Sequence, residues 1–127
     1  MKKFMNLTPH DVTLVKGSER VVLPATGITV RAAERKTVKG SEDINGLDIP
    51  VYGQLDYAEP TILDGTTPVP VEEFVTIFPE QKFIVSRIAY DSLKQYCPQY
   101  ADRFFVVSDP VRDDKGNIVG AASLAQP

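Results

Sequence analysis

The sequence has almost no cysteine and no long apolar run, and both absences limit where the protein can work. Among its 127 residues only Cys97 is a cysteine, so an intramolecular disulfide is impossible. Small secreted domains commonly depend on several disulfides. No segment approaches the ~20 apolar residues of a membrane-spanning helix, and the basic start lacks the apolar core of a signal peptide. We therefore predict one cytoplasmic domain, residues 1–127, without a membrane segment.

Residue types that usually hold metals or cofactors are equally scarce. The chain has one histidine, His10, and one cysteine, so the usual structural zinc sites cannot be assembled. The glycine-rich phosphate loops of nucleotide-binding proteins do not occur. We predict neither a metal nor a cofactor. Three roles for His10 remain open: a turn residue whose imidazole hydrogen-bonds the backbone, a ligand contact, or a catalytic base paired with Asp11.

Charge is unevenly distributed along the chain although its total is small. The formal net charge is -3, unlike the strongly basic balance that is typical of general nucleic-acid-binding domains. Residues 1–40 hold eight Lys/Arg and three Asp/Glu, whereas residues 41–80 hold nine Asp/Glu and no Lys/Arg. Either the two segments attract each other within or between subunits, or the basic residues form an anion-attracting patch. That patch would consist of Arg31, Arg35, Lys36 and Lys39.

Short β-branched and alternating runs predict that most of the chain is strand. Residues 12–15 and 20–23 flank a polar turn and predict a hairpin. Further strands are predicted at 28–33, 47–55, 74–78, 82–85 and 103–107, with a closing hairpin over 111–124. Residues 39–45 are predicted to be a loop. The acidic, proline-rich residues 56–73 are predicted to form an ordered surface loop or flap.

One segment has a helical rather than a strand period. Ala89, Leu93, Tyr96 and Cys97 are spaced as one face of a helix, and Ser86 is a suitable N-cap. This predicts one main helix at about 87–97, which could connect strands 82–85 and 103–107 as a βαβ unit. The predicted fold class is α+β, mainly β: a curved antiparallel or mixed sheet, or a small barrel, with one main helix.

The sequence offers one strong candidate for binding a small anion. Ser86 and Arg87 lie where a strand is followed by a helix. Free backbone N–H groups at the start of a helix favour an anion, and an arginine there can bind a phosphate with two parallel hydrogen bonds. The alternative is an ordinary N-cap with a solvated arginine. Tyr52 flanks the acidic segment and could stack on the ring of a ligand.

Four motifs are spread over nearly the whole chain: Leu7-Thr8-Pro9-His10, Leu23-Pro24-x-x-Gly27 followed by Arg31, Ile84-Val85-Ser86, and Asp109-Pro110-Val111-Arg112-Asp113-x-x-Gly116-x-Ile118-x-Gly120. In combination they resemble a family of small uncharacterised proteins of phages, prophages and bacterial genomes. The resemblance implies a phage setting rather than an activity. Small accessory proteins in that setting act as structural parts, as inhibitors of host proteins, or by sequestering nucleotide immune signals. Residues 56–73 look like an addition to the family pattern.

These observations support three functional hypotheses. The leading one is a non-enzymatic, phage-type accessory protein that sequesters a small anionic, nucleotide-like ligand such as an immune signal, and that forms a homo-oligomer. The second is a protein-interaction or phage structural module whose acidic 41–80 surface meets a basic host or phage partner. The third is a small hydrolase that uses His10 with Asp11. The ligand contacts predicted by the leading hypothesis are His10, Arg31, Tyr52, Ser86, Arg87 and Arg112.

Overall fold

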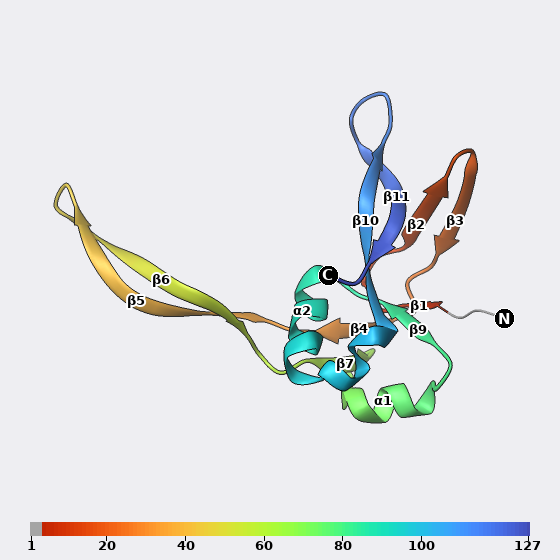
Figure 1. Ribbon diagram of the computed structural model, residues 1–127, viewed down its shortest axis with the longest axis horizontal. Coiled ribbons are helices and arrows are strands. Elements are labelled where there is room, and N and C mark those ends of the chain that lie inside the picture. The colour runs from red at the N-terminus through yellow and green to blue at the C-terminus, as the bar shows by residue number, and fades with distance from the viewer. Residues whose placement is uncertain (1–3) are drawn as a thin grey trace.

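A six-stranded mixed sheet forms the largest part of the fold. The computed structural model describes residues 4–127, apart from the side chains of residues 54 and 55. The sheet consists of β1 (Phe4–Asn6), β9 (Lys82–Ile84), β10 (Phe104–Arg112), β11 (Ile118–Ala125), β2 (Val12–Lys16) and β3 (Glu19–Leu23), in that order. β9 runs parallel to β1 and β10, and β11 runs parallel to β2. The sheet curls into part of a barrel (Figure 1), which confirms the predicted curved, mixed sheet.

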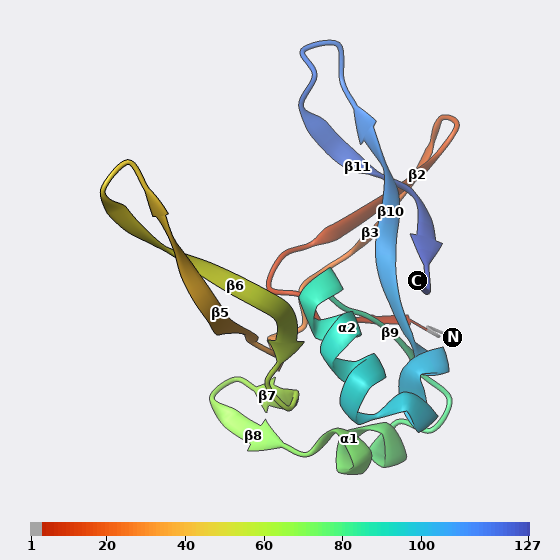
Figure 2. The same ribbon diagram turned by 60° about the vertical axis from the view of Figure 1, so that its left-hand side comes forward.

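Two smaller sheets and three helices complete the chain. The first small sheet contains β4 (Ile28–Arg31), β7 (Thr61–Asp64) and β8 (Thr67–Val69), and the second is the hairpin of β5 (Glu34–Ile44) and β6 (Leu47–Tyr57). The helices are α1 (Val71–Ile77), α2 (Arg87–Tyr96) and the 3-10 helix η1 (Pro98–Arg103). In Figures 1 and 2 the β5–β6 hairpin, hereafter the arm, extends away from the helices and the other sheets. Within residues 4–127, no helix has the length and apolarity to span a membrane.

The hydrophobic core lies between the helices and the strands that pack against them. Phe83 of β9 and Phe104 of β10 are fully buried, with ring centroids 5.2 Å apart, and Phe74 of α1 lies 5.4 Å from Phe83. Buried aromatic side chains contribute large apolar areas to a core, so this cluster fixes α1 against the parallel strands. The Arg103 guanidinium also donates to the carbonyls of Val75 and Phe78, which satisfies the end of α1.

Polar contacts hold the base of the arm against α2. Arg35 forms an ion pair with Asp56 at 3.1 Å and donates to the Tyr57 carbonyl at 3.2 Å. The Gln95 amide of α2 donates to Asp56 at 2.7 Å, and the Tyr96 hydroxyl donates to the Tyr57 carbonyl at 2.7 Å. Beyond this base every residue of β5 is exposed, so the arm is anchored at one end only.

The structure confirms several predicted elements. The hairpin of β2 and β3, the strand at β6 and the closing hairpin of β10 and β11 all form as predicted. The main helix α2 begins after Ser86, whose hydroxyl accepts from the Ala89 N–H at 3.3 Å as an N-cap. It connects β9 to the adjacent parallel strand β10, which is the predicted βαβ arrangement.

Three segments differ from the sequence prediction. Residues 39–45, predicted to be a loop, belong mostly to β5, since residues 40–44 pair with β6. The predicted strand at 74–78 is instead helical, because Val71, Phe74 and Val75 are buried with the spacing of a helix face. Within 56–73, where a surface loop was predicted, residues 61–69 form the β7–β8 hairpin that pairs with β4.

We predict that a larger residue at Gly120 separates β11 from β2. A Cβ at this position would lie 2.8 Å from Val15 Cγ2 and 3.0 Å from the Thr13 carbonyl oxygen, and a backbone atom cannot easily move away. Gly120→Val should therefore lower the free energy of unfolding by about 1–3 kcal/mol in urea denaturation. Ala122→Val, at an exposed position of the same strand, is the control and should be near neutral. Equal stability of the two variants would contradict the close approach.

We also predict that the base of the arm loosens in acid. Hydrogen bonds from Gln95 and from the Tyr57 N–H, with the charge of Arg35, lower the pKa of Asp56 from its ordinary value of 3.8. The pKa of Asp56 in the folded protein lies below its pKa in the unfolded chain. The ionised carboxylate therefore contributes its full stabilisation above the unfolded pKa, and this contribution is lost as the pH falls through the folded pKa. The side-chain amide signal of Gln95 in NMR should shift over this acid range, and Asp56→Asn should abolish the shift. A pH-independent Gln95 signal in the unmodified protein would refute this.

Candidate functional site

The candidate site lies where two adjacent parallel strands end. β1 ends at Asn6 and is followed by the loop Leu7–His10, whereas β9 ends at Ile84 and is followed by Val85 and the start of α2. Since β1 and β9 are parallel, both segments leave the sheet at the same edge. The Leu7 N–H donates to the Ile84 carbonyl at 2.9 Å and keeps the two segments together. Crevices at the carboxyl ends of parallel strands are a common place for ligand binding.

A buried asparagine holds the His10 loop in position. Asn6 is 2% exposed, and its side-chain amide donates to the carbonyls of His10 at 2.8 Å and Leu23 at 2.9 Å. Its side-chain oxygen accepts from the N–H and the hydroxyl of Thr8, at 2.9 and 2.7 Å. All four hydrogen-bonding positions of the amide are therefore occupied by the backbone or by Thr8. This network fixes the turn while the His10 side chain remains exposed.

The start of α2 provides donors for an anion. In a helix the first amides, here those of Arg87 and Ile88, have no acceptor within the helix. The Arg87 side chain is 64% exposed and uses only its Nε atom in the ion pair with Asp91, at 3.2 Å. Its two terminal nitrogens make no hydrogen bond with the described residues. Asp91 also accepts from the Tyr57 hydroxyl at 3.2 Å, so its negative charge is shared between two donors.

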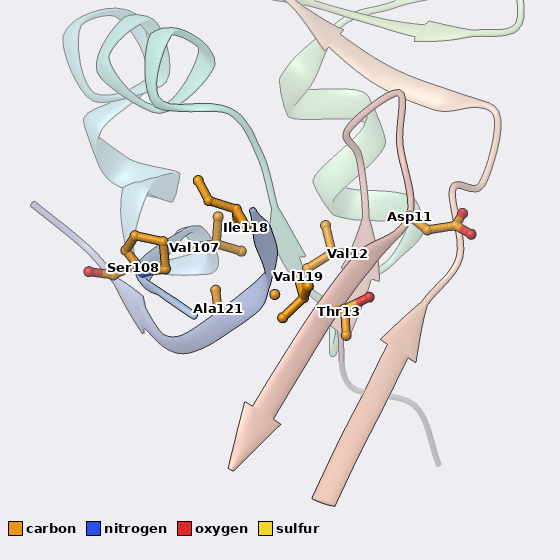
Figure 3. Close-up of a pocket in the computed structure, with 10 residues that line it drawn as sticks. Asp11, Val12, Thr13, Val107, Ser108, Ile118, Val119 and Ala121 are labelled. Atoms are coloured by element: carbon orange, nitrogen blue, oxygen red, sulfur yellow. The ribbon is translucent and has the colours of Figure 1, made fainter. Parts of the chain in front are cut away.

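Two adjoining cavities extend from this helix start along the sheet. The first, of about 350 Å³, is lined by valines and Ile84 on its apolar side, and its polar side consists of Thr8, His10, Asp11, Ser86 and Arg87. The second, of about 490 Å³, lies between β2 and the β10–β11 hairpin. They share Asp11, Val12 and Val107 as wall residues. Figure 3 shows apolar side chains around the second cavity, while the Asp11 carboxylate points away from it.

The six predicted ligand contacts do not all come together in one chain. His10, Ser86 and Arg87 line the same cavity, whereas Arg31, Tyr52 and Arg112 are not among its lining residues. Arg31 ends β4. Tyr52 lies on the arm, where the Lys36 ammonium is 5.6 Å from its ring centroid. Arg112 lies at the end of β10 and donates to the Gly116 carbonyl at 2.7 Å, within its own hairpin.

The geometry around His10 and Cys97 does not resemble a catalytic centre. The Asp11 carboxylate accepts from the Ala25 N–H at 2.8 Å and makes no hydrogen bond with the His10 imidazole. Burial, with smaller contributions from Glu59 and Glu72, raises the pKa of the Cys97 thiol, which disfavours the reactive thiolate. Within residues 4–127 no group of three or more His, Cys, Asp or Glu side chains is arranged to hold a metal ion.

The acidic segment 41–80 does not form one continuous surface. Glu42, Asp43 and Asp48 lie near the tip of the arm, whereas Glu72 and Glu73 are in the first turn of α1. Both ribbon views place the arm tip far from α1 (Figures 1 and 2). A basic partner surface would have to reach two separate places, so the structure gives no single acidic face for the second hypothesis.

Sequence reasoning missed three residues that shape the site: Asn6, Val12 and Val107. Asn6 precedes the Leu-Thr-Pro-His motif, and only its buried position reveals that it organises the turn. Val12 and Val107 form the wall shared by both cavities, but in the sequence they are ordinary strand residues. A polar residue between apolar neighbours, as Asn6 lies between Met5 and Leu7, is the one signal that could have indicated its role.

Comparisons of the chain with known protein families, with curated proteins and with solved structures find no match.

We predict that Asn6→Leu releases the His10 loop. The substitution removes four hydrogen bonds and takes the Asn6 donor from the Leu23 carbonyl, whereas the His10 carbonyl keeps the Thr8 hydroxyl at 2.8 Å. It should lower the free energy of unfolding by about 2–4 kcal/mol, because buried groups that lose their partners are costly. Amide hydrogen exchange at Thr8, whose N–H is bonded to Asn6, should accelerate more than exchange at Val22 in β3. Unchanged exchange at Thr8 would contradict the role of Asn6.

Proposed function

We propose that this chain is a non-enzymatic binding protein that takes a small anionic, nucleotide-like ligand at the cavity formed by His10, Ser86 and Arg87. One observation supports the proposal above all. Residues separated by more than seventy positions in the sequence line one cavity of about 350 Å³ at the start of a helix. That volume is within the range of small-ligand sites.

The polar side of the cavity suits a phosphate or another compact anion. The terminal nitrogens of Arg87 provide charge-assisted donors, and the first amides of α2 point along the helix axis from its positive end. The imidazole of His10 and the hydroxyl of Thr8 are on the same lining and can add hydrogen bonds. The Arg87–Asp91 pair keeps the guanidinium oriented through Nε while leaving its outer edge for the ligand.

The apolar side suits the remainder of a nucleotide. The adjoining cavity of about 490 Å³ is lined largely by aliphatic side chains of β2, β10 and β11. A base or ribose lying there would contact Val12, Val107 and Ile118 without an aromatic partner. Sites with a few convergent polar groups beside a larger apolar wall are typical of small-molecule binding. The two adjoining cavities together support a ligand that is bound at one end by charge and at the other end by apolar contact.

The phage resemblance extends this proposal to a biological role. An accessory protein that binds a nucleotide immune signal lowers the signal's free concentration in the host cytoplasm and needs no turnover. The separation of the Asp11 carboxylate from His10 agrees with binding rather than hydrolysis. Sequestration then requires only tight binding and sufficient protein.

The decisive variant is Arg87→Ala, tested by isothermal titration calorimetry with nucleoside mono- and diphosphates. Loss of the charge-assisted hydrogen bonds should weaken binding by about ten- to a hundredfold. His10→Ala should have a smaller effect, because it removes a single hydrogen bond to the ligand.

Arg112→Ala is the matched control, since it removes an arginine from a hairpin outside the cavity lining. It should leave the affinity unchanged. Equal losses in Arg87→Ala and Arg112→Ala would refute the single-chain site, and absence of any saturable binding by the unmodified protein would refute the proposed function.

A further inference from the structure

The arm presents a face of apolar side chains to solvent. The register pairs Ile44 with Leu47, Glu42 with Ile49 and Gly40 with Val51, and side chains of paired residues lie on the same side of a hairpin. Four of the side chains on this face are apolar and strongly exposed: Ile44 at 53%, Leu47 at 65%, Ile49 at 38% and Val51 at 38%. A two-stranded hairpin is at best marginally stable alone in water, so this arm needs a partner surface.

The edges of the arm are poorly suited to that partner. β6 contains Pro50, which has no N–H to donate to an added strand. β5 has a register shift between Val38 and Gly40, so Lys39 bulges out of the ladder. Proline and bulges are features that protect edge strands from pairing with another chain. The surface left for a partner is therefore the face rather than the edges.

The same face carries less side-chain bulk toward the base than at the tip. Gly40 and Gly53 bear no side chain, and a Cβ on Gly40 would meet nothing within 4 Å. Ile44 and Leu47 lie near the tip and are exposed. If two arms lie face to face and antiparallel, the apolar tip of each meets the region around Gly53 of the other. Such a contact is the same for both copies and closes with two-fold symmetry.

Charge on this face favours the same arrangement. Glu42 shares the face with Ile49, while Lys39 lies on it nearer the base, since its Cβ is 3.8 Å from the Cβ position of Gly53. Neither side chain has an ion-pair partner among the described residues. An antiparallel two-fold axis midway between them places Glu42 of each copy opposite Lys39 of the other. A parallel arrangement would instead bring like charges together.

We propose that two copies of this chain associate through the arm face, antiparallel, with Leu47 of each copy over Gly53 of the other and with Glu42 opposite Lys39. This surface is separate from the Arg87 cavity and extends the function proposed above. A strand of 11 residues is about 35 Å long, so the arms can overlap along most of their length.

The charge pairs allow an exchange experiment. Glu42→Lys alone and Lys39→Glu alone each place like charges opposite one another twice in a symmetric dimer. Each variant should raise the dimer dissociation constant at least about tenfold in sedimentation equilibrium. Mixing the two variants, with one chain ¹⁵N-labelled, should restore a heterodimer in native mass spectrometry, because both contacts are then attractive.

Asp48→Lys is the matched control, because it makes the same charge change as Glu42→Lys. Asp48 is adjacent to Leu47 and Ile49 in the sequence, but it pairs with Asp43 and points to the opposite side of the arm. It should leave the dimer intact. Gly53→Val tests the tip contact: it favours the strand conformation of the arm, yet it should weaken the dimer by occupying the space that receives Leu47 of the partner.

The outcomes separate clearly. Circular dichroism and thermal melting establish that each variant folds. A wild-type protein that stays monomeric at high micromolar concentration overturns the proposal, as does a mixture of the charge variants that forms no heterodimer. Normal dimerisation of Gly53→Val would exclude the face-to-face arrangement. Nucleotide titration of the same variants tests the Arg87 cavity independently, because none of these substitutions touches its lining.

Discussion

The position of β9 between β1 and β10 is the constraint on which the remaining structure depends. β9 is parallel to both neighbours, and Phe83 and Ile84 at its end are almost completely buried. A short strand that is buried on both faces cannot easily change register, because a slip by one residue would place Phe83 and Ile84 in spaces shaped for other side chains. The direction of β9 then determines where α2 begins. It also determines that the loop after β1 lies beside that helix start.

The molecule thereby combines a rigid centre with extended appendages. The centre contains the buried aromatic cluster, the fully bonded Asn6 and the capped start of α2. The arm, in contrast, is attached through Arg35, Asp56 and the residues of α2 around Tyr96. This division agrees with two separate binding surfaces. Precise positioning of donors benefits a small ligand, whereas an exposed apolar hairpin face benefits a large partner surface.

The sequence predicted the fold well where local signals agreed with burial. The α2 period, its Ser86 cap and the turns at Gly17 and Gly116, both with positive φ, produced the expected elements. Prediction failed where tertiary contacts override local character. Residues 39–45 were predicted to be a loop, but residues 40–44 are held by pairing with β6. Residues 74–78 were predicted to be a strand, but Phe74 packs on Phe83 of β9 from the helix α1.

The candidate site was only partly accessible to sequence reasoning for a related reason. Ser86 and Arg87 follow from a local strand-to-helix transition, and His10 belongs to a recognisable motif. Arg31, Tyr52 and Arg112 were grouped with them by chemistry alone, and no local pattern indicates that Tyr52 lies on an arm or that Arg112 lies in another hairpin. Convergence in space depends on the parallel pairing of β1 with β9, which joins segments far apart in the sequence.

The most direct test of the account is an NMR titration of ¹⁵N-labelled protein with a nucleoside diphosphate. If the ends of β1 and β9 form one anion site, the backbone amides of Arg87 and Ile88 and the His10 imidazole should shift together along one saturating curve. The signals of Tyr52 and Arg112 should stay unchanged. Independent curves at His10 and Arg87, or shifts confined to the hairpins outside the cavity, would contradict the central claim.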